Sequence, residues 1–173
     1  MTLSGGEPFY QSEFSIALLK SAKEAGLHTC VETSGFCPTS VIEEAAPLTD
    51  LFLFDIKETD EALHKQFTGV DNALILNNLR RLSELRAPVI LRCPIIPGYN
   101  ARQEHLDALA TIVKSLNHIM EIHLEPYHPF GVNKYDDLGL DAKCKNREFM
   151  PSEDALQAQR FLESLVPIPV RIS

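Results

Sequence analysis

Several features are missing from this 173-residue sequence, and their absence excludes whole classes of protein. No segment carries the basic stripe that tracks a nucleic-acid backbone, and the densest basic stretch, 142–147, is short. Sixteen basic and 24 acidic side chains give a net charge of −8, so we expect no nucleic-acid partner. No apolar run approaches the roughly 18 residues of a membrane span, and no charged-then-apolar leader opens the chain. We therefore expect a cytoplasmic protein with no membrane partner.

Cysteine is also scarce, and the four cysteines lack the short spacing of metal ligands: Cys30, Cys37, Cys93 and Cys144. Zinc sites and iron–sulfur clusters take thiolates from closely spaced positions. Three of these residues lie in or next to apolar or proline-bounded stretches, where free cysteine behaves as a small buried side chain. The pattern predicts buried, reduced thiols.

The composition is that of a globular protein, with 45% apolar and 23% charged residues. The length favours a single domain, residues 1–173. Apolar residues recur at three- and four-residue steps in most of the predicted helices, which are 11–25, 39–46, 60–67, 72–86, 102–117 and 152–165. Asp60 and Ser152 are the expected caps of two of them.

Predicted strands alternate with these helices, at 27–32, 50–57, 89–93, 119–127 and 167–172. Repeated strand–loop–helix units imply parallel strands joined by right-handed crossovers, so the fold class is α/β. The continuous apolar run in 50–57 predicts a strand buried on both faces. The last strand contains two prolines and should lie at a sheet edge.

The stretch Thr2–Pro8 is the most informative turn of the chain. Gly5 and Gly6 have no Cβ, so the backbone there can turn sharply and approach a ligand closely. Glu7 adds a carboxylate that could accept charge-assisted hydrogen bonds. Taken alone, the stretch is equally compatible with a tight turn that ends a short strand before Pro8.

Charged and polar residues close each predicted strand: Glu7, Glu32 with Thr33, Asp55 with Lys57, Arg92, and Glu125 with His128. In parallel α/β folds the loops at the carboxyl ends of the strands converge and bind ligands. Each residue alone is more often a solvated charge than a ligand. Five sets at the same end favour one shared site.

In order and spacing, segments over nearly the whole chain resemble the activating enzymes of glycyl radical enzymes. These are the pyruvate formate-lyase activase group of the radical S-adenosylmethionine (SAM) superfamily. The resemblance rests on residues 3–8, 29–35, 50–57, 64–70, 75–82, 91–100 and 125–131. It implies a partial TIM-like (β/α) barrel of parallel strands that holds SAM across its top. In such enzymes a [4Fe–4S] cluster reduces SAM, and the 5′-deoxyadenosyl radical removes a hydrogen from a glycine of a partner enzyme.

The resemblance also implies roles for individual residues. Gly5, Gly6 and Glu7 would receive the SAM amino group, while Lys57 and His128 would face its ribose and carboxylate, with Arg92 nearby. Glu32, Thr33 and Asp55 match positions that surround a monovalent cation beside the SAM carboxylate. The expected SAM site therefore comprises Gly5, Gly6, Glu7, Glu32, Asp55, Lys57, Arg92 and His128.

One departure from the family pattern is large. No C-x-x-x-C-x-x-C triplet occurs in the sequence, although the family carries it on the loop after its first strand. By family order that first strand–loop–helix unit would precede Met1, so we expect this chain to be inactive alone. It would be either a shortened activase or a cluster-free module that binds SAM or docks a glycyl radical enzyme. A missing first strand would also expose a sheet edge and favour self-association or a disordered amino terminus.

Two further hypotheses concern the remaining residues. A metal-dependent hydrolase or lyase could use His28, His123 and His128 with Glu32 and Asp55, although the histidines lack close ligand spacing. The long segment 130–151 has little periodicity and is typical of a lid or binding loop.

Overall fold

The computed structural model describes residues 1–130 and 148–173 of the chain. Its six strands form one sheet in the order β1-β2-β3-β4-β5-β6, and every neighbouring pair is parallel. The strands are β1 (Thr2–Leu3), β2 (Cys30–Thr33), β3 (Leu51–Asp55), β4 (Val89–Ile95), β5 (Ile119–Pro126) and β6 (Val170–Ile172). This is the predicted α/β fold, an open partial barrel.

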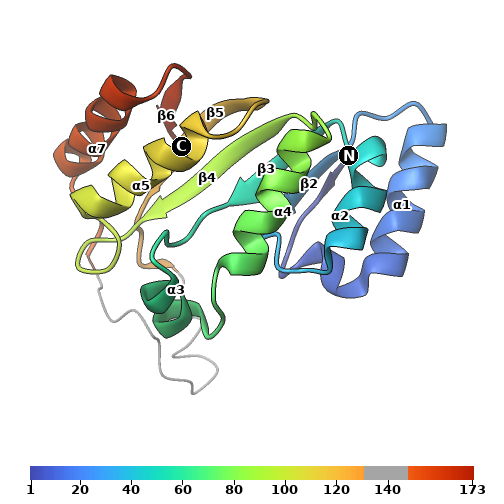
Figure 1. Ribbon diagram of the computed structural model, residues 1–173, viewed down its shortest axis with the longest axis horizontal. Coiled ribbons are helices and arrows are strands. Elements are labelled where there is room, and N and C mark those ends of the chain that lie inside the picture. The colour runs from blue at the N-terminus through green and yellow to red at the C-terminus, as the bar shows by residue number, and fades with distance from the viewer. Residues whose placement is uncertain (131–147) are drawn as a thin grey trace.

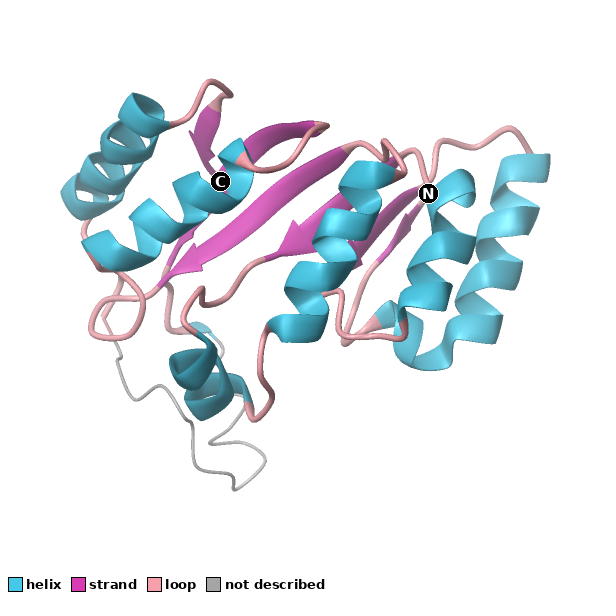
Figure 2. Ribbon diagram, viewed as in Figure 1, coloured by secondary structure: helices cyan, strands magenta, loops and turns pink. Residues whose placement is uncertain are grey.

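The helices follow the strands in alternation (Figure 2). They are α1 (Ser12–Glu24), α2 (Thr39–Ala45), α3 (Glu61–Thr68), α4 (Ala73–Glu84), α5 (Gln103–Lys114) and α7 (Ser152–Leu165), with short 3-10 turns η1 (Pro8–Gln11) and η2 (Ala46–Leu48). All six predicted helices are confirmed, with bounds that differ by a few residues at most. The predicted loop over 130–151 falls mainly on residues outside the described part of the chain.

The helices cover one face of the sheet. Figure 1 shows α4 in front of β3, with α5 and α7 toward one end of the sheet and α2 and α1 toward the other, and α3 near the end toward which the arrows of β3 and β4 point. Buried and half-buried residues alternate along β3 and β4, because only one face lies under helices. Phe52 and Phe54 point into the core, whereas Leu51, Leu53 and Asp55 lie on the face that no described helix covers, here called the open face. The prediction that this strand is buried on both faces was therefore wrong.

Local signals explain where α3 begins and ends. The Asp60 carboxylate accepts a hydrogen bond of 2.9 Å from the Leu63 amide, as predicted for a cap. Gly69 ends the helix in the left-handed conformation, with φ of 95°. Ser152, the other predicted cap, is instead the first residue of α7, and its helix begins after Pro151 without a side-chain cap. Pro151 precedes the helix in an extended conformation, with φ of −58° and ψ of 136°.

The two ends of the sheet are also visible from the sequence pattern. β6 is an edge strand, as its prolines predict, and begins just after Pro169. β1 lies at the other edge and pairs with β2, so the amino terminus is ordered in this structure and the alternative of a disordered terminus is not supported.

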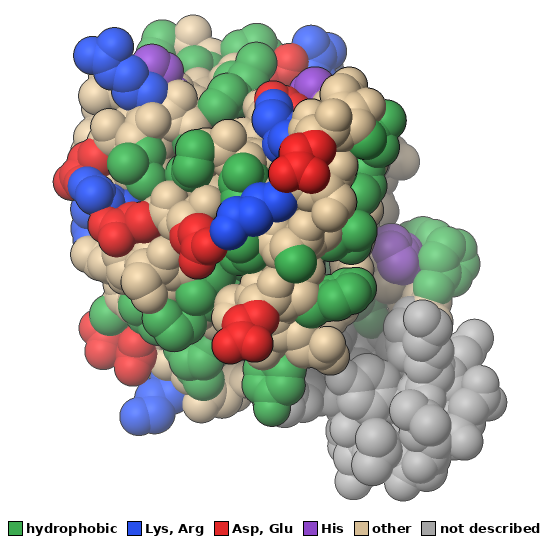
Figure 3. Space-filling model, turned by 90° about the vertical axis from the view of Figure 1, so that its right-hand side faces the viewer, with side chains coloured by type: hydrophobic (Ala, Val, Ile, Leu, Met, Phe, Trp, Pro, Cys, Tyr) green, Lys and Arg blue, Asp and Glu red, His purple; other side chains and the backbone are tan. Residues whose placement is uncertain are grey.

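Over the side where α1 lies, acidic and basic side chains are interspersed with apolar ones (Figure 3). Among the described helices, none has both the length and the apolar character to cross a membrane.

Candidate functional site at the carboxyl ends of the strands

The loop after β1 exposes its backbone. Gly5 and Gly6 have φ of 94° and 54°, and no atom lies within 4 Å of the position that a Cβ would take. Side chains rarely adopt these conformations, so glycine is required here by the turn. The loop lines a hollow of about 530 Å³ together with Tyr10 and Phe14. The prediction of an accessible turn is therefore confirmed.

The Glu7 carboxylate is hydrogen-bonded to other parts of the chain, which the sequence did not predict. It accepts hydrogen bonds from the Thr33 hydroxyl at 2.7 Å, from the Ser34 amide at 2.9 Å and from the Ser34 hydroxyl at 2.6 Å. The Phe9 amide donates a fourth, at 3.2 Å. Glu7 thus ties the glycine loop to the end of β2 and leaves the peptide carbonyls of the loop as the exposed acceptors.

Four polar side chains form a row across the open face, here called the charged row: Ser4, Glu32, Arg92 and Glu125. The Ser4 hydroxyl donates to Glu32 at 2.7 Å, and the Arg92 guanidinium donates to both Glu32 and Glu125. Strand register brings these residues together, since Glu32 and Arg92 lie on β2 and β4 on either side of β3. The row joins the loop after β1 to β5.

The electrostatics of the charged row favour the ionised forms of Glu32 and Arg92. The hydrogen bond from Ser4, with help from Arg92, lowers the pKa of Glu32. Burial acts against the charge of Arg92, but its bonds to Glu125 and Glu32 prevail and raise the pKa of the guanidinium. Lys57 and Asp55 add smaller effects, on Glu32 and Arg92 respectively. The three charged residues of the row therefore share one electrostatic neighbourhood with Asp55 and Lys57.

Asp55 and Lys57 close β3 beside this row. The Lys57 ammonium donates to Asp55 Oδ2 at 2.7 Å, and 44% of its side chain remains exposed. The second oxygen, Asp55 Oδ1, is buried and has no hydrogen-bond partner within the described residues. A buried carboxylate oxygen without a donor is costly, which makes it a sign of a missing ligand.

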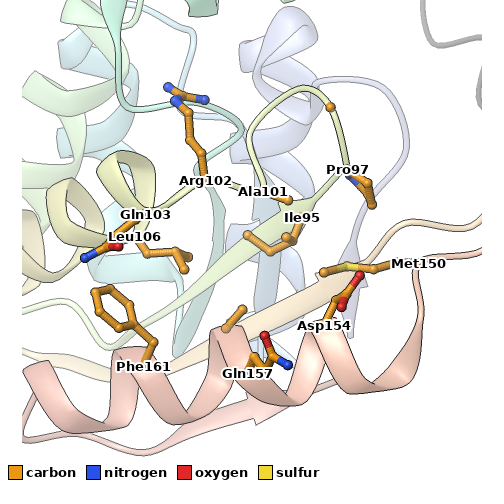
Figure 4. A pocket seen from close by; sticks show the side chains of 12 residues that line it. Ile95, Pro97, Ala101, Arg102, Gln103, Leu106, Met150, Asp154, Gln157 and Phe161 are labelled. Atoms are coloured by element: carbon orange, nitrogen blue, oxygen red, sulfur yellow. The ribbon is translucent and has the colours of Figure 1, made fainter.

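A polar cluster behind Lys57 was not foreseen. Glu58 is fully buried and receives two bonds from Arg102, at 2.7 and 2.8 Å, and two from the amides of Thr59 and Asp60. His105, also fully buried, faces Glu58 at 3.3 Å, and burial lowers its pKa to about 4. A cavity of about 480 Å³ lies between the loop after β4, α5 and α7. Figure 4 shows Arg102 at the edge of this cavity with its guanidinium pointing away from it, as its bonds to Glu58 require. No pattern in the sequence links positions so far apart.

His128 lies outside the hydrogen-bonded network of the row. It follows β5, is exposed, and its ring stacks at a tilt on Phe130, with the ring centroids 4.8 Å apart. Its role toward SAM remains a prediction. Of the histidines in the metal-hydrolase hypothesis, His123 bonds to Glu121 at 2.9 Å on the open face, and His28 is exposed just before β2.

The predicted cation site is only partly assembled. Thr33 uses its hydroxyl on Glu7 and on the Gly35 amide, and both Glu32 oxygens are engaged, so Asp55 Oδ1 is the unpaired oxygen of the set. Within residues 1–130 and 148–173, no three His, Cys, Asp or Glu side chains are grouped to hold a metal. The cation assignment stays a prediction, and the metal-hydrolase hypothesis receives no support.

The described cysteines behave as predicted. Cys30, Cys37 and Cys93 are buried free thiols, while Cys144 lies outside the described residues. Burial raises the pKa of all three, that of Cys37 to about 12. Such thiols are poor metal ligands and poor nucleophiles.

Comparison with known proteins agrees with this geometry. Residues 1–110, more than half of the chain, match the model of the Radical SAM superfamily. The chain belongs to the radical SAM superfamily. Members of this superfamily use SAM and a [4Fe–4S] cluster, and the residues present here fit the two unequally. The unpaired Asp55 oxygen, the exposed Lys57 ammonium and the open glycine loop suit SAM, whereas the described cysteines offer no set of cluster ligands.

This radical SAM chain is similar in sequence to two curated enzymes and in structure to a solved domain. It is 41% identical to the isethionate sulfite-lyase activating enzyme of Desulfovibrio desulfuricans over 143 residues, which cover 82% of this chain and 46% of that protein. It is 35% identical to the pyruvate formate-lyase-activating enzyme of Staphylococcus aureus, covering 99% of this chain and 71% of that protein. A domain of pyruvate-formate lyase-activating enzyme from Bacteroides vulgatus superposes with a TM-score of 0.83 at 29% identity, covering 100% and 98%. The chain thus spans less than half of the first relative.

Proposed function

We propose that this chain is the SAM-holding part of a glycyl radical enzyme activase. The observation that carries the proposal is the unpaired, buried Asp55 Oδ1 beside an exposed lysine at the end of β3. SAM is a zwitterion that also carries a sulfonium charge, so it needs an acidic, a basic and a backbone-acceptor surface together. The carboxyl ends of the strands supply all three kinds of surface side by side: Asp55, Lys57 and the Gly5–Gly6 loop.

Each chemical group of SAM has a matching protein group. The Lys57 ammonium would meet the SAM carboxylate, and carbonyls of the Gly5–Gly6 loop would accept from the SAM ammonium, because the Glu7 carboxylate already has four donors. Arg92 holds Glu32 and Glu125 in place, and Asp55 offers its free oxygen to a positive group. His128, exposed after β5, would face the ribose.

Calorimetry with SAM tests this site. Lys57→Ala should weaken binding at least about tenfold while changing stability by less than about 1 kcal/mol, since the Lys57–Asp55 pair is half exposed. Lys20→Ala is the control, because Lys20 also forms a lysine–carboxylate ion pair, with Glu44 on the helical layer, in a more exposed position. Absence of binding, or binding that ignores Lys57, would reject the proposed function.

The chain would not cleave SAM reductively on its own, because its sequence lacks the C-x-x-x-C-x-x-C triplet. Anaerobic reconstitution with iron and sulfide should leave no stable cluster absorbance, and dithionite should produce no 5′-deoxyadenosine from SAM. Formation of either would contradict this part of the proposal. SAM binding without turnover is expected both of a shortened activase and of the alternative function, a non-catalytic module.

The partner would be a glycyl radical enzyme, in keeping with the relatives, which are activating enzymes of two different lyases. Pull-down of a purified glycyl radical enzyme by this chain, with and without SAM, tests docking. Self-association through β1 also remains a prediction, because among the described strands β1 has a neighbour on one side only. Sedimentation that shows only monomer would remove it.

A further inference from the structure

Asn100 joins the ends of two strands at the site. It is almost fully buried, at 2% exposure, in the loop between β4 and α5. Its amide nitrogen donates to the carbonyls of Lys57 and Pro94, both at 2.7 Å, and its oxygen accepts from the Ile96 amide at 2.6 Å. All of these partners are backbone groups, so the contacts fix the path of the chain.

These contacts hold the segment that carries Lys57. The Lys57 side chain adds little to this hold, because it reaches toward Asp55 with nearly half its surface in solvent. Asn72 holds the following residues instead, through the carbonyls of Glu58 and Thr59. The next residue, Glu58, is anchored by Arg102, which lies two positions after Asn100. The loop after β4 therefore holds the loop after β3 by hydrogen bonds to two consecutive residues, Lys57 and Glu58, and these contacts are here called the grip.

We propose that Asn100 is a positioning residue of the SAM site: it fixes the Lys57 backbone against the end of β4, so that the ammonium stands beside Asp55 and the charged row. This inference rests on the proposed function and deepens it. Asn100 does not itself touch SAM in this scheme. Its effect on affinity passes through Lys57.

Two substitutions test the hydrogen bonds in different ways. Asn100→Ala removes both donors and leaves two carbonyls without partners. Asn100→Asp keeps the shape and the acceptor for the Ile96 amide but turns an oxygen toward both carbonyls. If the aspartate variant does not fold, the alanine variant alone carries the test.

Thr29→Val is the matched control. Thr29 is fully buried at the opposite end of the sheet, and its hydroxyl bonds to the Leu48 carbonyl at 2.7 Å and to Asp50 at 3.0 Å. The control loses buried hydrogen bonds as Asn100→Ala does, but far from the site. It should lower the melting temperature and leave the affinity for SAM unchanged.

A double-mutant cycle shows whether Asn100 acts through Lys57. Asn100→Ala should weaken SAM binding about tenfold in the chain that keeps Lys57. It should weaken binding less than about twofold in the chain that already carries Lys57→Ala. A merely structural role would produce the same loss in both backgrounds. An equal loss, or a loss no larger than that of Thr29→Val, would overturn the inference.

Hydrogen exchange separates this inference from the proposed function. Without any ligand, the amides of Thr59 and Asp60 should exchange at least about tenfold faster in Asn100→Ala than in Thr29→Val, because the loop is released. If wild-type chain binds no SAM but this exchange rises, the proposed function fails and the grip on the loop stands. Unchanged exchange would reject the grip, whatever the affinity.

Discussion

The two aspartates at the ends of β3 are satisfied to very different degrees. Asp50, just before the strand, accepts from Lys23 at 2.6 Å, from the Thr29 amide at 2.8 Å and from the Thr29 hydroxyl. Asp55, at its other end, accepts from Lys57 and leaves a buried oxygen without a partner. The carboxylate at the amino end of the strand has its partners within the protein, whereas the one at the carboxyl end keeps a free oxygen, as the proposed SAM site requires.

The same contrast holds for the surrounding side chains. At the amino ends, the Ser83 hydroxyl donates to the Asn117 carbonyl and accepts from its amide, and the Lys23 hydrogen bond keeps the pKa of Asp50 below its ordinary value. At the carboxyl ends, charged side chains meet one another in the charged row. Active sites commonly give up stability for function in this way.

Loss of Arg102 should be the most damaging change at the carboxyl end. Arg102→Ala leaves Glu58 buried without its main partner, so the free energy of unfolding should fall by about 3 kcal/mol in urea titrations. Arg81→Ala is the control, because its pairs with Glu43 and Glu84 are exposed to solvent and should contribute much less to stability. Equal losses would show that Glu58 tolerates water.

The two ends of β2 differ in how closely their glycines are packed. A Cβ at Gly35, after the strand, would lie 2.2 Å from Phe54 Cζ, with φ at +72°. Gly35→Ala should therefore cost about 2–3 kcal/mol by thermal or urea unfolding. Gly26, before the strand, has φ of +71° with nothing within 4 Å, so Gly26→Ala should cost about 1 kcal/mol. A similar cost at both positions would mean that Phe54 moves aside.

Replacing Asp50 or Asp55 with asparagine tests whether the two ends of β3 differ in their contributions to stability and to SAM binding. Asp50→Asn weakens bonds to Lys23 and Thr29, so stability should drop by about 1–2 kcal/mol with no change in SAM affinity. Asp55→Asn should change stability by less than about 1 kcal/mol, because one oxygen has no partner to lose, and should weaken SAM binding. Urea unfolding and calorimetry on both proteins measure the pair, and a reversed pattern would refute the contrast.

Acid should loosen the carboxyl end first, through His105. Burial lowers the pKa of His105 to about 4, so between pH 6.5 and 4 the unfolded chain binds a proton that the folded chain does not. Stability should fall as the pH drops through this window, by about 1 kcal/mol between pH 6.5 and 5.5. His105→Asn keeps an acceptor for the Thr59 amide and should abolish this slope. An unchanged slope would assign the proton to another group.

Periodicity and strand-end chemistry predicted most of the fold and part of the site. Helices, strands and the edge position of β6 follow from local patterns. The meeting of Glu32 with Arg92 follows from parallel strands that end together. Local sequence could not show that Glu7 bonds to Ser34, nor that Asn100 and Arg102 grip the loop of Lys57, because these contacts depend on how separate loops fold over the rim.

A single titration of isotope-labelled chain with SAM, followed by backbone amide NMR, tests most directly whether the strand ends form one site. Signals of Gly5, Gly6, Asp55, Lys57 and Arg92 should shift together and yield one dissociation constant, while those of Thr29 and Asp50 stay fixed. Shifts confined to one loop, or separate affinities for the glycine loop and for Lys57, would contradict a shared site.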